Sequence, residues 1–150
     1  MDKRVYTWAE VEDMAAAIAA GAKGHGFNSI IAVSRGGLIP AYFVASRLGI
    51  KKIHTICLSA YEGIHKGELK LESPMMPVIE KGDKVLVIDD ICDTGETLAY
   101  IKAAYLYCVI YTATLINKNV IEPPNFYAEV LPLATWAVFP WEAYEESLSR

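Results

Sequence analysis

Residues 85–98 read VLVIDDICDTGETL, and this stretch decides the expected fold. An uncharged apolar run, Val85 to Ile88, is followed at once by two carboxylates, Asp89 and Asp90. A polar turn with a glycine (residues 93–97) then leads into a segment that can form a helix. In an open α/β sheet, this order places acidic and phosphate-binding groups at the carboxyl end of a buried strand, where such sheets bind ligands. Main-chain N–H groups and two hydroxyls at a helix N-terminus suit a phosphate.

The simpler interpretation is that the two aspartates only end a strand and keep a loop in water, which is the usual reason for a lone aspartate there. The acidic pair, the turn and two threonines occur together here, and this combination favours a ligand site. The chain has neither a GxxxxGK[ST] loop nor a GxGxxG fingerprint, so the site is not a P-loop or a Rossmann dinucleotide site.

The rest of the chain alternates between strand-like and helix-like segments. Thr7 and Glu10 form a predicted capping box at the start of the first helix, which we expect to end at Gly21 or Gly24. Further helices are predicted over residues 40–48, where Gly49 ends the helix, and over residues 96–105 and 141–148. Strands are predicted over residues 30–33, 52–58, 84–88, 108–116 and 127–131. This alternation predicts an α/β fold in a single domain, residues 1–150, with a mostly parallel central sheet flanked by helices. Residues 60–78 have no clear period and are expected to form a mobile excursion such as a β-ribbon, and long loops of this kind often serve as lids.

Composition limits the classes of partner. The net charge is −4 with acids and bases interspersed, so we expect no nucleic-acid partner, which would need a basic face. Three cysteines are an odd count and indicate reduced thiols in a cytoplasmic protein, with Cys92 as a small residue that fills the loop. The longest uncharged stretch, residues 103–117, is too short to cross a membrane.

Four blocks of sequence together resemble a known family. They are IIAVSRGGLIP (residues 30–40), VLVIDDICDTGETL (85–98), Lys118 after a strand, and TWAVFPWE (135–142). The second block resembles the phosphoribosyl-diphosphate (PRPP) binding signature of type I phosphoribosyltransferases, and the four blocks in order resemble the bacterial xanthine-guanine phosphoribosyltransferases. The resemblance implies that fold, with a small hood at about residues 60–78 and a purine-binding segment at about residues 118–142. It also implies an enzyme that moves ribose 5-phosphate from PRPP to an oxo purine, releasing diphosphate, with Mg²⁺ as cofactor.

The resemblance also implies roles for residues on the PRPP side. Asp89 and Asp90 would hold the ribose hydroxyls and the metal, directly or through water, and Asp93 would serve as general base beside the purine. Thr94 and Thr97 have N-capping as an ordinary role, which can coexist with phosphate binding. The 5′-phosphate would be bound by Thr94, Gly95, Glu96 and Thr97, and the diphosphate by Ser34, Arg35, Gly36 and Gly37.

On the purine side, the Lys118 ammonium would donate to the 6-oxo group, Trp136 would stack on the base, and the carbonyl of Ala137 would accept from the 2-substituent. An exposed lysine at a strand end and a core tryptophan are the alternatives. The chain departs from the family at Gly67, where an arginine is usual, and Lys66 or Lys70 would have to replace that arginine. The preference among guanine, xanthine and hypoxanthine stays open.

Two other functions remain open at this point: a PRPP-binding regulatory protein, and a phosphoribosyltransferase for another base. The resemblance implies a homo-oligomer, a tetramer or a dimer. Four tyrosines can either line a subunit contact or belong to the core: Tyr100, Tyr105, Tyr107 and Tyr111.

Overall fold

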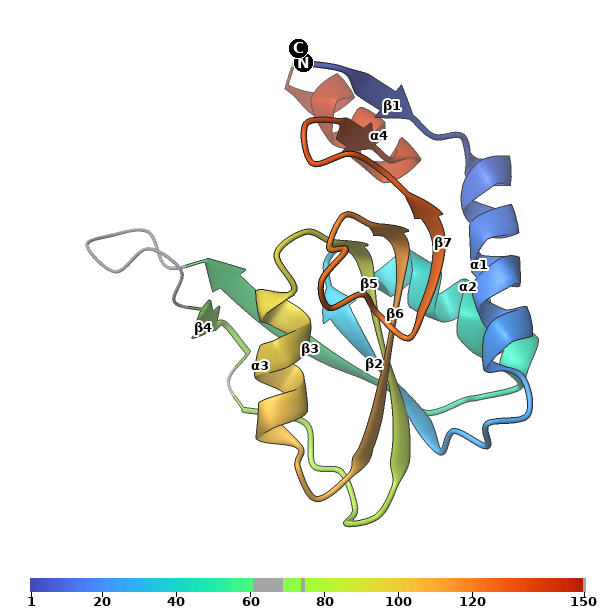
Figure 1. Cartoon of the computed structure of the whole chain (residues 1–150), viewed down its shortest axis with the longest axis vertical. Coiled ribbons are helices and arrows are strands. Elements are labelled where there is room, and N and C mark those ends of the chain that lie inside the picture. The colour runs from blue at the N-terminus through green and yellow to red at the C-terminus, as the bar shows by residue number, and fades with distance from the viewer. Residues whose placement is uncertain (61–68, 74, 150) are drawn as a thin grey trace.

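The computed structural model of the chain describes residues 1–60, 69–73 and 75–149. Its helices are α1 (Trp8–Ala22), α2 (Leu38–Leu48), α3 (Glu96–Ala104) and α4 (Pro140–Leu148) (Figure 1). Its strands are β1 (Lys3–Val5), β2 (Ser29–Ser34), β3 (Ile53–Ala60), β4 (Leu69–Leu71), β5 (Lys84–Cys92), β6 (Val109–Asn117), β7 (Phe126–Val130) and β8 (Trp136–Val138).

Six of these strands form the central sheet, in the order β4-β3-β2-β5-β6-β7. All neighbouring pairs are parallel except β3 and β4, which run antiparallel. The expected α/β fold with a mostly parallel central sheet is therefore confirmed. Because β2, β5, β6 and β7 are parallel, their carboxyl ends meet at one edge of the sheet, at the top in Figure 1.

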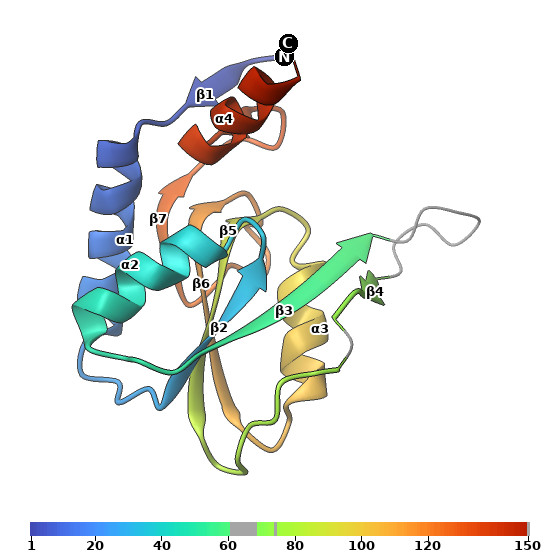
Figure 2. The ribbon, with the colours of Figure 1, turned by 180° about the vertical axis from the view of Figure 1, so that it is seen from behind.

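Helices cover both faces of the sheet, and the strands divide their side chains between them. In β2, Ile30 and Ala32 pack with α1 and α2, while Ile31 and Val33 pack in a second core with α3. β5 alternates in the same way. Successive side chains of a strand point to opposite faces, so a continuous apolar run is required when both faces are covered. Figure 2 shows α1 and α2 on one side of the sheet and α3 on the other.

Local signals fix the helix ends. The Thr7 hydroxyl accepts from the Glu10 main-chain N–H, and the Glu10 carboxylate accepts from the N–H of Thr7, which completes the predicted capping box. α1 ends at Ala22, between the two glycines considered from sequence, and Gly24 follows with φ of 88°. α2 ends against Gly49, which adopts the left-handed conformation that favours glycine.

A small second sheet joins the two ends of the chain. β1 pairs in parallel with β8, with Arg4 opposite Ala137. Tyr6 stacks on Phe139 at 5.3 Å between ring centroids, and Phe139 stacks on Trp141 at 4.6 Å. These residues and α4 form a terminal lobe above the carboxyl edge of the main sheet (Figure 1). Neither β1 nor β8 was expected from the sequence.

Two expectations near the centre were wrong. Strand β5 continues through the acidic pair to Cys92 and does not end at Ile88, because β6 pairs with it as far as Asn117. Cys92 is therefore a buried strand residue and not part of the loop. Burial raises the pKa of its thiol, and the charge of Asp89 adds to this effect, which disfavours the reactive thiolate form.

The excursion between β3 and β5 is described in part. β4 pairs with β3, with Lys70 opposite Ser59, which agrees with the ribbon considered from sequence. Lys66 and Gly67 lie outside the described residues. Among the tyrosines, Tyr105 belongs to the core and donates its hydroxyl to the Pro77 carbonyl, whereas Tyr100 and Tyr107 are exposed. No helix in the described part of the chain combines the length and apolarity needed to cross a membrane.

Candidate active site

The sequence-predicted site residues come together at the carboxyl edge of the sheet. Ser34 ends β2, the acidic pair lies near the end of β5, and Lys118 directly follows β6. The main-chain N–H of Lys118 donates to the Cys92 carbonyl over 2.8 Å. The loops after three neighbouring strands therefore lie side by side, as expected at this edge of a parallel sheet.

The loop between β2 and α2 lies directly against the acidic pair because two of its residues lack a side chain. A Cβ atom on Gly36 would lie 2.3 Å from Asp90 Oδ2. On Gly37 it would lie 2.4 Å from the Ile88 carbonyl oxygen and 2.7 Å from that of Val33. No larger residue fits without displacing these atoms. The glycines of the predicted diphosphate loop thus bring its backbone onto β5.

Arg35 projects from this loop into solvent. Its side chain is 79% exposed, and its guanidinium forms an ion pair of 2.7 Å with Glu145 of α4. The peptide bond between Ser34 and Arg35 is cis. The Ser34 hydroxyl donates to the Ile56 carbonyl of β3, which ties the start of the loop to the sheet.

The acidic pair is held by the chain's own amides. Asp89 accepts from the N–H of Asp90, and Asp90 accepts from the N–H of Ile91, each over 2.8 Å. Burial raises the pKa of Asp89 well above its usual range, and the neighbouring charge of Asp90 raises it further. Two adjacent carboxylates are suited to a bound cation. The cation would favour their ionised forms and so counteract both the burial of Asp89 and its repulsion by Asp90.

The predicted phosphate loop has a free helix N-terminus. Gly95 stands at the N-cap of α3 with φ of 84°, and no side chain in the described part of the chain caps the helix. The Thr94 hydroxyl accepts only a long 3.4 Å bond from the Glu96 N–H. Ordinary N-capping therefore does not explain the threonines. The loop lines a hollow of about 90 Å³, whose walls are residues 91–98. First-turn N–H groups have no partner within the helix, so they are available to an anion.

Asn119 supports the phosphate loop from behind, and sequence analysis did not identify it. Its side-chain amide donates to the Thr94 carbonyl over 3.0 Å, and its side-chain oxygen accepts from the N–H groups of Ile121 and Glu122. A Cβ on Gly95 would lie 2.7 Å from Asn119 Nδ2. In the sequence, Asn119 is only a polar residue that follows Lys118. Nothing there links it to the distant turn at Gly95, so this contact could not be predicted.

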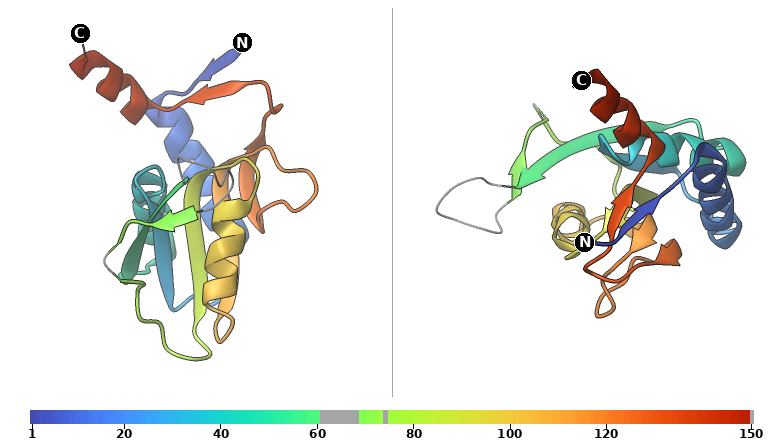
Figure 3. Two further views of the ribbon diagram at one scale, coloured as in Figure 1. Left: turned by 90° about the vertical axis from the view of Figure 1, so that its left-hand side faces the viewer. Right: turned by 90° about the horizontal axis from the view of Figure 1, so that it is seen from above.

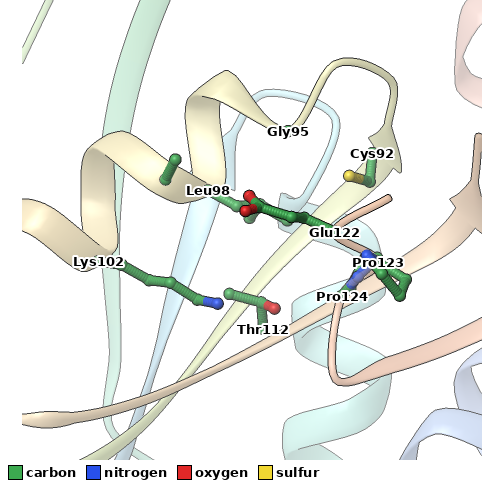
Figure 4. Close-up of a pocket in the computed structure, with 9 residues that line it drawn as sticks. Cys92, Gly95, Leu98, Lys102, Thr112, Glu122, Pro123 and Pro124 are labelled. Atoms are coloured by element: carbon green, nitrogen blue, oxygen red, sulfur yellow. The ribbon is translucent and has the colours of Figure 1, made fainter. Parts of the chain in front are cut away.

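A second hollow, of about 240 Å³, lies between α3 and the loop before β7 (Figure 4). It shares Cys92, Gly95 and Leu98 with the phosphate loop's hollow. Its charged residues, Lys102 and Glu122, have opposite signs, so its charge does not favour a polyanion. The smaller hollow within residues 91–98 is the better match for a phosphate group.

The predicted purine-binding residues lie above the same edge. The Lys118 ammonium donates to the Thr135 carbonyl over 2.6 Å, which links the end of β6 to the start of β8. Trp136 is not a core residue, since it is 54% exposed, whereas Ala137 is buried. The N–H of Trp136 and the carbonyl of Val138 bond to the β1 segment. In a parallel pair, alternate residues of a strand form main-chain hydrogen bonds with the neighbouring strand. Ala137 lies between two residues that bond to the β1 segment, so its own N–H and carbonyl face away from β1.

Glu142 is a further acidic residue near the site. Its carboxylate accepts from the Phe139 N–H over 2.8 Å at the start of α4. Burial raises the pKa of Glu142, and the charge of Asp90 also contributes. The terminal lobe therefore places a carboxylate within electrostatic reach of the acidic pair. Sequence analysis included Glu142 in the block of residues 135–142 but gave it no role.

An open parallel sheet with two glycine-containing loops and an acidic pair at its carboxyl edge has the architecture of α/β proteins that bind ligands at this edge. The chain belongs to the phosphoribosyl transferase domain family, whose model matches residues 3–147. Its fold is that of the type I phosphoribosyltransferases.

Solved structures agree with this assignment. The chain is similar to a purine phosphoribosyltransferase from Pyrococcus horikoshii Ot3, with 31% identity, a TM-score of 0.82, and coverage of 95% of either chain. It resembles in fold a xanthine-guanine-hypoxanthine phosphoribosyltransferase from Helicobacter pylori (21% identity, TM-score 0.76, 98% of this chain and 97% of that chain). It also resembles in fold a hypoxanthine phosphoribosyltransferase from Trypanosoma cruzi in complex with IMP (23% identity, TM-score 0.63, 83% of this chain and 75% of that chain).

Proposed function

We propose that the protein transfers ribose 5-phosphate from PRPP to guanine, xanthine or hypoxanthine, giving the nucleoside monophosphate and diphosphate, with Mg²⁺ as cofactor. The observation that carries this proposal is the contact between Gly36 and Asp90. It places the loop of Ser34 to Gly37 on one side of the acidic pair, while the loop of residues 93–97 continues from its other side.

This order matches the order of groups in PRPP. The loop of residues 93–97 binds the 5′-phosphate through first-turn N–H groups of α3 and the Thr94 and Thr97 hydroxyls. Asp89 and Asp90 bind the ribose hydroxyls between the two loops. Arg35 and the main-chain N–H of Gly36 bind the diphosphate, and the guanidinium offers a fork of donors for phosphate oxygens. The Gly37 N–H already donates to the Val33 carbonyl over 2.8 Å, so Gly37 contributes by keeping the loop close to β5.

The acidic pair suits Mg²⁺, which takes few protein oxygens and keeps waters or substrate oxygens as its other ligands. The described residues contain no group of three or more acidic, histidine or cysteine side chains that could enclose a metal. Asp89 and Asp90 would hold the ion, and the raised pKa of Asp89 supports this fit, because a bound cation favours its ionised form. When bound, the ion neutralises negative charge on the diphosphate.

The chain's own contribution is mainly positioning and electrostatics, because positive charge develops on the ribose and negative charge on the leaving diphosphate. Asp93 is exposed at the start of the phosphate loop, where its carboxylate accepts the proton from the attacking purine nitrogen. Arg35 and the adjacent N–H groups stabilise the departing diphosphate.

Oxo purines are selected by the segment after β6 and by β8. Lys118 donates to the 6-oxo group, so it leaves the Thr135 carbonyl or shares its protons between the two oxygens. Trp136 offers a half-exposed ring for stacking. The Ala137 carbonyl accepts from the 2-substituent side. Adenine, which lacks the 6-oxo acceptor, leaves the Lys118 ammonium without this bond.

The test is a substrate panel. The protein is incubated with Mg²⁺, PRPP and each of guanine, xanthine, hypoxanthine, adenine, uracil and orotate, and diphosphate release is measured. Release with at least one oxo purine, and not with the pyrimidines, supports the proposal. Release only with another base assigns a different phosphoribosyltransferase. PRPP binding without turnover of any base points to the regulatory protein considered from sequence.

A further inference from the structure

The ion pair between Arg35 and Glu145 presents a conflict that the proposed reaction does not explain. Arg35 is the cation of the predicted diphosphate loop, yet its guanidinium is already paired with a carboxylate 2.7 Å away. Glu145 lies on α4, far along the chain from the loop, and Figure 2 shows α4 above the loop that joins β2 to α2. An anion that binds Arg35 must therefore compete with Glu145 or share the guanidinium with it.

The aromatic contacts and the capping contact that hold α4 lie at its start. Trp141 stacks on Phe139, and its ring centroid lies 6.0 Å from that of Trp8. Glu142 caps the helix through Phe139. No residue of α4 is buried. Among the described residues, the pair between Glu145 and Arg35 is the ion pair that joins α4 to the rest of the protein beyond its first turn. Figure 3 shows α4 extending away from the main sheet beyond its anchored end.

The helix geometry explains why Glu145 makes this contact. Glu142 and Glu145 are three residues apart, so both carboxylates lie on the side of α4 that faces the carboxyl edge of the sheet. Glu142 is occupied by the N–H of Phe139. Within the described residues Glu145 accepts no such main-chain bond, and it is 50% exposed, so it can exchange Arg35 for water at little cost.

We infer that Glu145 is a positioning residue for the reaction: an internal counter-ion that holds Arg35 in the unliganded protein and is displaced by the diphosphate group. This inference rests on the proposed function, because it takes Arg35 as a diphosphate ligand. Glu145 weakens the binding of every anion that uses Arg35. It therefore limits unproductive binding of inorganic phosphate and favours release of the diphosphate product. It also links occupancy of the diphosphate loop to the position of α4.

The energetics set the size of the effect. Exposed ion pairs contribute little in water, so removing the competitor tightens anion binding by about two- to fivefold and no more. Neutralising another acidic residue of α4 also reduces repulsion of the anion. That effect is smaller, because the charge lies farther from the anion and salt screens the interaction. Glu146 provides the matched control, because it is the next residue, is exposed, and has the same charge.

The test measures the binding of inorganic diphosphate in the presence of Mg²⁺ by calorimetry, for the full chain and four variants: Glu145→Gln, Glu146→Gln, Arg35→Gln, and the double variant Arg35→Gln with Glu145→Gln. We expect Glu145→Gln to lower the Kd about two- to fivefold and Glu146→Gln to change it by less than half that factor. When Arg35 is already replaced by Gln, adding Glu145→Gln should change the Kd for diphosphate no more than Glu146→Gln changes it in the otherwise wild-type protein. The KM for PRPP should fall in Glu145→Gln while the KM for the purine stays unchanged.

Equal effects of Glu145→Gln and Glu146→Gln would overturn the inference, since they would show general repulsion by α4. That result leaves the proposed function intact if Arg35→Gln still weakens diphosphate binding. If Arg35→Gln leaves the affinity unchanged, the assignment of Arg35 as a diphosphate ligand fails, and the role of Glu145 fails with it. Circular dichroism of each variant verifies that α4 and the sheet remain folded.

Discussion

The substitution Gly36→Ala tests the contact that joins the diphosphate loop to the acidic pair. A Cβ atom at this position would lie 2.3 Å from Asp90 Oδ2 and 2.8 Å from Oδ1, whereas ordinary contact begins at 3.4 Å. The difference between the shortest of these distances and ordinary contact is about 1.1 Å, so either the carboxylate or the loop must move by that amount. Asp90 is a short side chain whose Oδ1 accepts from the Ile91 N–H, so it cannot move freely.

The cost in stability follows from this hydrogen bond. A hydrogen bond to a charged group contributes about 1.5–3 kcal/mol. Alanine in place of glycine returns about 0.4–1 kcal/mol by restricting the unfolded chain, because Gly36 is not among the positive-φ glycines. The net loss is about 0.5–2.6 kcal/mol, which lowers the Tm of a chain of this size by roughly 1–10 °C. Activity suffers more, because a displacement of about 1 Å at a reacting centre costs on the order of 100-fold in rate.

The assay combines thermal unfolding with the rate of nucleoside monophosphate formation at saturating PRPP and Mg²⁺. Gly21→Ala is the control, because this residue lies in α1, away from the site, and its Cβ would meet only the Phe126 ring at 3.3 Å. That variant should keep its activity and its Tm, since alanine favours the helix. Wild-type Tm together with activity within threefold of wild type in Gly36→Ala would refute the close approach of Gly36 and Asp90.

Three further predictions concern single residues. Asp93→Asn should lower kcat more than it raises the KM for PRPP, whereas Thr97→Ala should mainly raise that KM; steady-state kinetics would contradict both roles if the pattern were reversed. Trp136→Ala should raise the KM for the purine about 5- to 150-fold, because stacking contributes about 1–3 kcal/mol, while the KM for PRPP stays the same; equal effects on both would argue against stacking. Asp89 has a raised pKa in the folded protein, so the folded state holds its proton more tightly than the unfolded state. The stability of the metal-free protein should therefore fall as pH rises from the ordinary aspartate range through the raised value. Asp89→Asn should remove this pH dependence and raise the Tm at neutral pH while it lowers activity, and unfolding curves with unchanged pH dependence would count against the burial of that carboxylate.

The parts of the fold with strong local signals were predicted from sequence. The capping box of Thr7 and Glu10 set the start of α1, and Gly49 set the end of α2. The uncharged runs of β2 and β5 indicated strands covered on both faces, and the two cores on opposite sides of the sheet agree with this. The order of these elements was enough to predict the parallel sheet and the edge that carries the site.

The remaining features depend on contacts between distant segments. β1 and β8 are three residues each, and they form a sheet only because the two ends of the chain meet. The extension of β5 through two aspartates depends on its pairing with β6, which outweighs the low strand preference of aspartate. Asn119 and Glu145 act through partners far along the chain, Thr94 and Arg35, so their own sequence surroundings did not indicate these contacts.

The central claim is that the loop after β5 binds the phosphate of an activated ribose, with the acidic pair holding Mg²⁺ beside it. Calorimetric titration of the protein with PRPP, with and without Mg²⁺, tests this claim most directly. We predict saturable binding at one site per chain, weakened when Mg²⁺ is removed and weakened again in Thr97→Ala. A flat titration with Mg²⁺ present, for protein that unfolds cooperatively on heating, would contradict the assignment of the site.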